Sequence, residues 1–109
     1  MAIAYKQLGQ IKNAAATQEL LYVVPASTEA VVSSIIICNQ SGTATSFRVA
    51  VLPGGGTVAT TDYIYFDLPI SGNDTFIATI GLTLATTDEI EVYATLATLS
   101  MSVYGTEIT

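Results

Sequence analysis

The sequence contains no histidine, a single cysteine and only three basic residues among its 109 positions. Without histidine, the side chain most used for acid–base chemistry near neutral pH is missing. Cys38 alone cannot form an internal disulfide, and none of the usual cysteine spacings of a zinc site exists. We therefore expect no enzyme, with no catalytic residue, no metal site and no cofactor.

The shortage of positive charge limits the partners that the chain can bind. Lys6, Lys12 and Arg48 stand against nine acidic residues, which gives a net charge of -6. Duplex nucleic acid and anionic membrane surfaces are bound mainly through clustered Lys and Arg side chains. Three scattered cations cannot form such a cluster, so we expect neither nucleic acid nor a membrane as a partner.

Long hydrophobic runs are also missing. The apolar runs, such as "SIIIC" at 34–38, fall far short of the ~20 residues that a membrane-spanning helix needs. The stretch "MAIAYKQLGQ" at the N-terminus lacks the basic region and apolar core of a secretion signal. We expect the chain to fold in a cytoplasm.

Apolar residues, in contrast, are abundant. They make up 50% of the chain, whereas charged residues make up 11%. Disordered chains show the opposite balance, because they have too little apolar surface to offset the entropy of ordering. The length and composition predict one domain, residues 1–109, that buries somewhat over ~60% of its unfolded-chain surface.

Apolar residues recur mainly with a period of two, which is the period of β-strands. The stretch "EAVVSSIIICN" at 29–39 is rich in β-branched residues and apolar on both faces, as expected for a strand buried in a sandwich. We expect strands near residues 3–8, 19–24, 29–39, 45–52, 62–68, 73–84, 88–96 and 99–105.

The connections between these strands have turn composition. Stretches such as "PASTE", "NQSGT" and "PISGND" concentrate Pro, Gly, Asn, Asp and Ser. About eight short strands at this spacing predict an all-β fold, an antiparallel β-sandwich or jelly-roll. Residues 1–18 are expected either to join the sandwich or to form an extended N-terminal arm.

The stretch "PGGGTVATTDY" at 53–63 raises the question of phosphate binding. A phosphate loop needs a helix directly after its glycines and usually ends in Gly-Lys-Ser/Thr. Here no lysine follows, and the loop leads into a predicted strand. We therefore expect a flexible connection between strands.

Glu89 and Glu91 share a strand face. At this position a solvated acidic surface that protects the strand edge is favoured over a calcium site.

Tyrosines are concentrated in "DYIYFDL" at 62–68. Strict alternation would direct Ile64, Phe66 and Leu68 to the core and place Tyr63 and Tyr65 on the outer face. Outward tyrosines are enriched at protein interfaces and on sugar-binding platforms, because they offer large area with little rotamer entropy to lose. The alternative, that both faces of this strand are buried within the monomer, fits the sequence equally well.

Several sequence patterns follow one another between residues 21 and 108. They are a Val-Pro-Ala turn before a long apolar strand, an Asn-Asp-Thr strand opening, and "L-x-x-x-D-x-I-x-V-x-A" running into "S-x-x-x-Y-G-x-E-I". In these patterns the chain resembles small tailed-bacteriophage virion proteins, a group that includes capsid decoration (cement) proteins and β-sandwich modules of tails and fibres. The resemblance implies a β-sandwich or jelly-roll subunit, frequently trimeric, that adds to an assembled particle and has no active site.

The resemblance leads to one main hypothesis and one alternative. The main hypothesis is a capsid decoration protein, a homo-oligomer and most simply a trimer, that folds in the host bacterium and stabilises the virion by binding the major capsid lattice. The alternative is a tail- or fibre-associated module that recognises a host surface glycan, through loops 39–46 and 53–62, or another tail protein. Apolar terminal arms often dock on a neighbour, and outward tyrosines suit interfaces. The expected contact residues are Tyr5, Leu8, Tyr63, Tyr65 and Tyr104.

Overall fold

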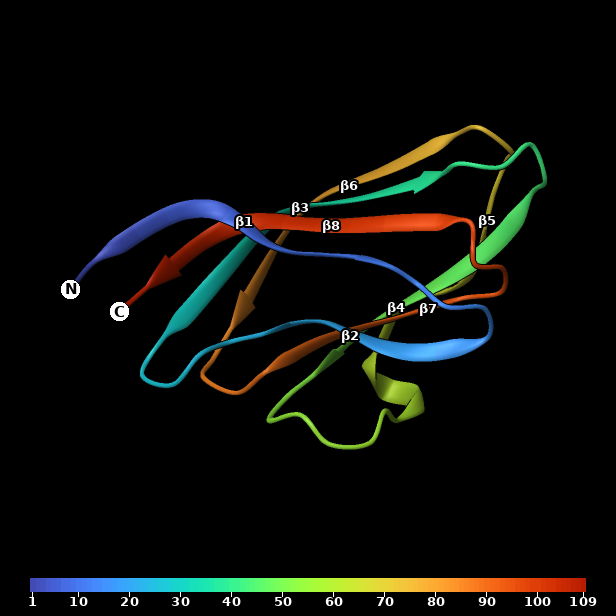
Figure 1. The fold of residues 1–109 in the computed structure, drawn as a ribbon. Helices are drawn as coiled ribbons and strands as arrows, with labels where there is room; N and C mark the ends of the chain where they lie inside the picture. The colour runs from blue at the N-terminus through green and yellow to red at the C-terminus, as the bar shows by residue number, and fades with distance from the viewer.

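The computed structural model describes all of residues 1–109 as two packed four-stranded sheets (Figure 1). Every pair of neighbouring strands is antiparallel, so the predicted eight-stranded β-sandwich is confirmed. Sheet A has the order β1 (Ile3–Lys12), β8 (Leu99–Ile108), β3 (Glu29–Asn39), β6 (Thr75–Leu84). Sheet B has the order β2 (Thr17–Val23), β7 (Glu89–Ala94), β4 (Thr45–Leu52), β5 (Tyr63–Ile70).

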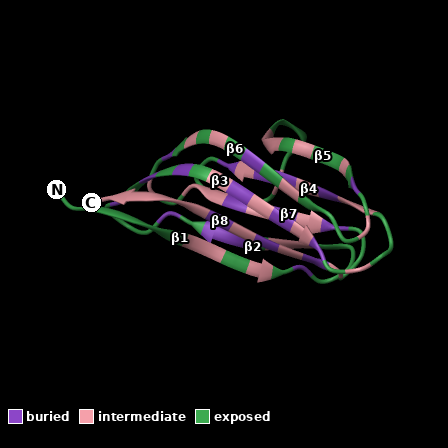
Figure 2. Ribbon diagram, turned by 90° about the horizontal axis from the view of Figure 1, so that it is seen from above, coloured by how far each residue is buried: buried purple, intermediate pink, exposed green.

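The core lies between the two sheets and is built from alternate residues of the central strands. Phe47 and Val49 on β4, and Ile35 and Ile37 on β3, are essentially inaccessible to solvent. Burying one such side chain contributes roughly 1.5–3 kcal/mol. In Figure 2 the buried segments follow β3, β8, β4 and β7, while the edge strands are largely half-buried or exposed. The central strands therefore carry most of the hydrophobic stabilisation.

Most predicted strands appear where the period of two places them. The strands β3 and β4 coincide with the predicted ranges 29–39 and 45–52. β1 is longer than expected and pairs with β8 along the edge of sheet A, so residues 3–12 belong to the sheet. The only helical segment is a single 3-10 turn, Thr60–Asp62, and nothing helical in the structure could span a membrane.

The predicted faces of β5 are wrong for Ile64, Tyr65 and Phe66, whereas Leu68 packs against the core as expected. Ile64 and Phe66 are 39% and 53% exposed, whereas Tyr65 turns inward and packs against Phe47, with the ring centroids 6.5 Å apart. The pairing of β5 with β4 shifts register twice, and Asp67 adopts a positive φ of 51°. Each extra residue of a bulge moves the following side chains to the opposite face. One of these shifts lies between Tyr63 and Tyr65, so the two residues, which the sequence placed side by side, lie on opposite faces.

At one end of the sandwich, a buried asparagine ties two loops together. The Asn39 side chain is 1% exposed, and its Nδ2 donates to the carbonyls of Thr43 (2.9 Å) and Ser71 (3.1 Å). In the same region Gly72 lies against the backbone of Gly42, where an added Cβ would have no room. The loop at 39–46 is consequently held in one conformation by the neighbouring loop.

Candidate functional site

The outer face of sheet A is broad and carries few charges. We call it the sheet A face. Because side chains alternate along a strand, the residues facing away from the core follow from the strand register. Lys12 and Glu29 are its only ionic side chains. The remaining members are Ile3, Tyr5, Gln7, Gln10, Val31, Ser34, Ile36, Cys38, Thr75, Ile77, Thr79, Thr83, Ser100, Ser102, Tyr104, Thr106 and Ile108.

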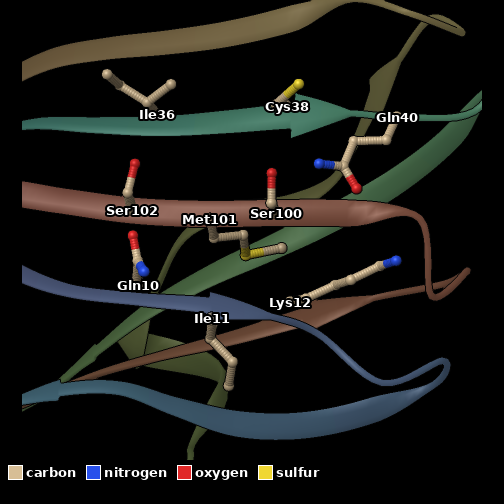
Figure 3. Close-up of a pocket in the computed structure, with 9 residues that line it drawn as sticks. All are labelled: Gln10, Ile11, Lys12, Ile36, Cys38, Gln40, Ser100, Met101 and Ser102. Carbon is tan, nitrogen blue, oxygen red and sulfur yellow. The ribbon is translucent and has the colours of Figure 1, made fainter.

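A shallow groove of about 410 Å³ lies toward the Lys12 and Ser100 end of the sheet A face (Figure 3). Ser100 and Ser102 of β8 lie between Ile36 and Cys38 of β3 on one side and Gln10 of β1 on the other. Met101 and Ile11, which also line the groove, point the opposite way (Figure 3). The groove presents hydroxyl, amide and apolar groups, a combination suited to surface contact rather than to acid–base chemistry.

Several large apolar side chains of the sheet A face are exposed to solvent. Tyr5 is 82% exposed, Ile77 61%, Ile3 51% and Val31 37%. They come from three strands, β1, β3 and β6. Ile3, Tyr5 and Val31 lie toward the Thr106 and Ile108 end of β8, and Ile77 lies across from Ile36 beside the groove. Exposed apolar side chains that gather on one face indicate a surface for another macromolecule.

Two of the five predicted contact residues, Tyr5 and Tyr104, lie on this same face. Gln7 lies across from Tyr104 on the neighbouring strand, and Gln7 Nε2 donates a 3.3 Å hydrogen bond to the Tyr104 hydroxyl. Gln7 Nε2 also donates to Gln10 Oε1 at 3.0 Å. Tyr104 is therefore held flat beside β1, whereas Tyr5 projects freely.

The other three predicted contact residues lie elsewhere. Leu8 sits at the register shift between β1 and β8 and is partly buried against the core. Tyr65 is also partly buried against the core, and its ring centroid lies 5.3 Å from that of Phe76. Tyr63 lies beside Phe66 instead, with the two ring centroids 4.9 Å apart. The structure thus does not bring the five residues together in one site.

Sheet B presents a second feature on its outer face, an arginine held between two aromatic rings. The guanidinium carbon of Arg48 lies 4.2 Å from the centre of the Phe66 ring and 4.5 Å from that of Tyr93. Its Nε and Nη2 donate to the two carboxylate oxygens of Asp67 at 2.6 and 3.3 Å. This hydrogen bonding raises the pKa of Arg48, with a smaller contribution from Tyr63. We call Arg48, Tyr63, Phe66, Asp67 and Tyr93 the arginine cluster.

The glycine loop is fastened to an acidic turn. Gly54, Gly55 and Gly56 all have positive φ, and the Gly54 N–H donates to Asp88 Oδ1 at 2.8 Å. The Glu89 side chain lies against Gly55, and its burial, together with the neighbouring Glu91, raises the pKa of Glu89. Two acidic side chains therefore occupy the space where a phosphate would bind. The loop acts as a fixed turn.

The segment that contains this loop also covers part of sheet B. Ala50 and Leu52 alternate with core residues of β4 and so point away from the core, yet they are 0% and 1% exposed. The 3-10 turn of residues 60–62 contacts β4 on this side, where Figure 1 shows the connecting segment beyond sheet B. Segment 53–62 therefore leaves less of sheet B available for contact than of sheet A.

The acidic residues are distributed unevenly between the two sides of the sandwich. No group of three or more His, Cys, Asp or Glu side chains is arranged to hold a metal ion. The outer side of sheet B nevertheless carries most of the negative charge. Its acidic residues are Asp62, Asp67, Asp88, Glu89 and Glu91.

Sequence reasoning did not identify two parts of these surfaces. Neither Ile77 nor Arg48 was assigned to a surface from the sequence. The alternation of side chains does indicate that both residues point outward, because Ile77 lies between the core-facing Phe76 and Ala78, and Arg48 lies between Phe47 and Val49. The position of each strand within its sheet was the missing information.

No protein-family model matches this sequence, and no curated protein matches it either. The function proposed below therefore rests on the surfaces themselves.

Proposed function

We propose that this chain is a virion structural protein, a capsid decoration subunit that binds the major capsid lattice and stabilises the particle. The observation that supports this proposal best is the sheet A face, which is broad, has few charges and exposes Ile3, Tyr5 and Ile77. A rigid β-face with aromatic and aliphatic anchors suits binding to a repeated protein surface. Its serine, threonine and glutamine side chains remain compatible with solvent before assembly.

The N-terminal segment of this surface is best tested by point substitution. Removing residues 1–10 would delete most of β1, which pairs with β8 over its length, so the fold itself would be disturbed. The Tyr5→Lys substitution keeps β1 and changes a side chain that is 82% exposed. Binding is measured by co-sedimentation of the purified protein with capsids built from the major capsid protein of the same genome.

The expected result is that wild-type protein sediments with the capsids and that Tyr5→Lys binds at least about tenfold more weakly, as loss of an exposed aromatic anchor would cause. The matched control is Leu20→Lys, because Leu20 is 47% exposed on β2 of sheet B. Full binding by the control and weak binding by Tyr5→Lys support the proposal. Equal binding by all three proteins contradicts the assignment of the sheet A face.

A second candidate function rests on the arginine cluster. Phe66 is 53% exposed, and an exposed aromatic ring offers an apolar platform on which a sugar ring can stack. Under this alternative the chain is a tail- or fibre-associated module for a host surface glycan. A glycan array probed with wild type and Phe66→Ala distinguishes the two functions, because a decoration protein should show no sugar preference.

A further inference from the structure

We infer that β6 is a self-pairing edge, through which two copies of this chain join sheet A into one continuous eight-stranded sheet. The inference depends on the strand geometry and not on a virion role. It concerns residues Thr75–Thr79, the first half of β6.

The other three edge strands carry features that oppose strand pairing. β1 has Lys6, Lys12 and a register shift at Leu8, and β2 is short, contains Glu19 and also shifts register. β5 contains Asp67, Pro69 and two register shifts. Charges, proline and bulges on an edge are the usual protection against unwanted pairing.

β6 has no such protection between Thr75 and Thr79. The whole strand, "TFIATIGLTL", contains no charged residue and no proline, and its pairing with β3 is regular from Thr75 to Thr79. The irregularity with β3 begins only after Thr79. A regular, uncharged edge is a template for another strand.

The backbone groups that face the open edge can be assigned from the ladder. The Asn39 N–H donates to the Asp74 carbonyl at 2.9 Å, and paired residues of an antiparallel ladder alternate between bonded and non-bonded positions. Phe76 and Ala78 consequently bond toward β3, whereas Ile77 and Thr79 direct their N–H and C=O groups outward. The Thr75 N–H already donates to Asp74 Oδ1 at 2.8 Å.

The sequence of this segment is complementary to itself in the antiparallel direction. Centring a two-fold axis on Ile77 places Ile77 opposite its own copy and Thr75 opposite Thr79 of the second molecule. On the inner face, Phe76 then lies opposite Ala78, a large side chain beside a small one. Thr–Thr and aliphatic cross-strand pairs are favourable, and the symmetry closes after two copies.

The charge distribution favours a second copy over another partner. The chain carries a net charge of -6, so two copies repel each other wherever acidic residues meet. Along Thr75–Thr79 there are none, and in the proposed register the two Asp74 side chains lie at opposite ends of the paired segment. A basic partner would be attracted instead to the acidic side of sheet B.

Sedimentation equilibrium tests the inference on the purified full chain. We expect wild type to reach twice its 11.4 kDa mass as the concentration rises. The Ile77→Lys variant should dimerise at least about tenfold more weakly, since like charges would face each other across the axis. The Leu20→Lys control adds the same charge to β2 and should dimerise like wild type. A wild type that stays monomeric or reaches three times the monomer mass, or an Ile77→Lys variant that dimerises normally, overturns the inference.

Amide hydrogen exchange of wild type provides a test that does not depend on the folding of a variant. The N–H groups of Ile77 and Thr79 should exchange rapidly in dilute protein and at least about tenfold more slowly in concentrated protein. Those of Phe76 and Ala78 should be protected at both concentrations. Rapid exchange of Ile77 and Thr79 at every concentration excludes the paired edge.

Discussion

The Tyr22 hydroxyl donates a 2.6 Å hydrogen bond to Glu107 Oε2 and thereby joins the two sheets. Tyr22 is 6% exposed on β2 of sheet B, and Glu107, on β8 of sheet A, also forms a 2.8 Å ion pair with Lys6. Burial, followed by the bond to Glu107, raises the pKa of Tyr22. The hydrogen bonds from Lys6 and then Tyr22 lower the pKa of Glu107. Both shifts favour a neutral phenol that donates to an ionised carboxylate.

Replacing Tyr22 by Phe should lower the free energy of unfolding by about 1.5–3 kcal/mol, the usual range for a hydrogen bond to a charged group. The ring still fills its place in the core, so only the bond between the sheets is lost. Urea denaturation at pH 7 measures the difference. Tyr104→Phe serves as control, because its hydroxyl lies on the sheet A face, and we expect a change within about 0.5 kcal/mol. Equal losses in the two variants would contradict a special role for the Tyr22 bond.

Glu107 should make the stability of the fold depend on acid pH. Its pKa is lowered in the folded protein, so its stabilising contribution is present above the ordinary value of 4.5 and is lost as the pH falls through the folded pKa. The difference in unfolding free energy between wild type and Glu107→Gln should therefore shrink below pH 4.5. Denaturation curves between pH 7 and pH 3 measure this difference. The raised pKa of Glu89 acts in the opposite direction, but it is common to both proteins and cancels. A difference that stays constant across the range would show that Glu107 is not the group responsible.

Gly72 and Gly81 should respond differently to substitution by alanine. At Gly72 an added Cβ would meet the carbonyl oxygen and other backbone atoms of Gly42, and backbone cannot rotate aside as a flexible side chain can. Gly72→Ala should cost about 1–3 kcal/mol, as overpacking does. Gly81→Ala has open space around its Cβ and should be neutral or stabilising by up to about 1 kcal/mol. Melting temperatures by calorimetry compare the two, and a Gly72→Ala protein as stable as wild type would show that the loops can separate.

Arg48→Lys preserves the charge of the arginine cluster but loses its planar fork. A lysine can bind only one carboxylate oxygen of Asp67 at a time and stacks less well between Phe66 and Tyr93. We expect the free energy of unfolding to fall by about 0.5–1 kcal/mol, because Arg48 remains partly exposed to solvent. Lys12→Arg on the sheet A face is the matched control and should leave stability unchanged. A loss in the control as large as that in Arg48→Lys would mean that stacking at the cluster is not the cause.

The strand positions could be predicted because they depend on local properties. The run at 29–39 is β-branched and is flanked by turn residues, so β3 begins and ends where expected. The faces of β5 could not be predicted in the same way. The rule of alternation assumes that no residue is extra, and the only local sign of a bulge is Asp67, a residue type that tolerates positive φ better than most.

Only part of the candidate surface could be predicted from the sequence, because its composition depends on which strands are neighbours in the sheet. Tyr5 and Tyr104 lie nearly a hundred positions apart in sequence and share a face because β1 pairs with β8. Ile77 matters because β6 lies at the edge of sheet A. The order of strands in a sheet is decided by contacts between distant parts of the chain, and no local period encodes it.

The concentration of acidic residues on the outer side of sheet B gives the molecule an electric dipole that runs across the sandwich. A positively charged support should therefore adsorb the protein by sheet B and leave the sheet A face directed toward the solution. On an anion-exchange surface the immobilised protein would thus have one orientation, with Tyr5 and Ile77 accessible to any protein passed over it.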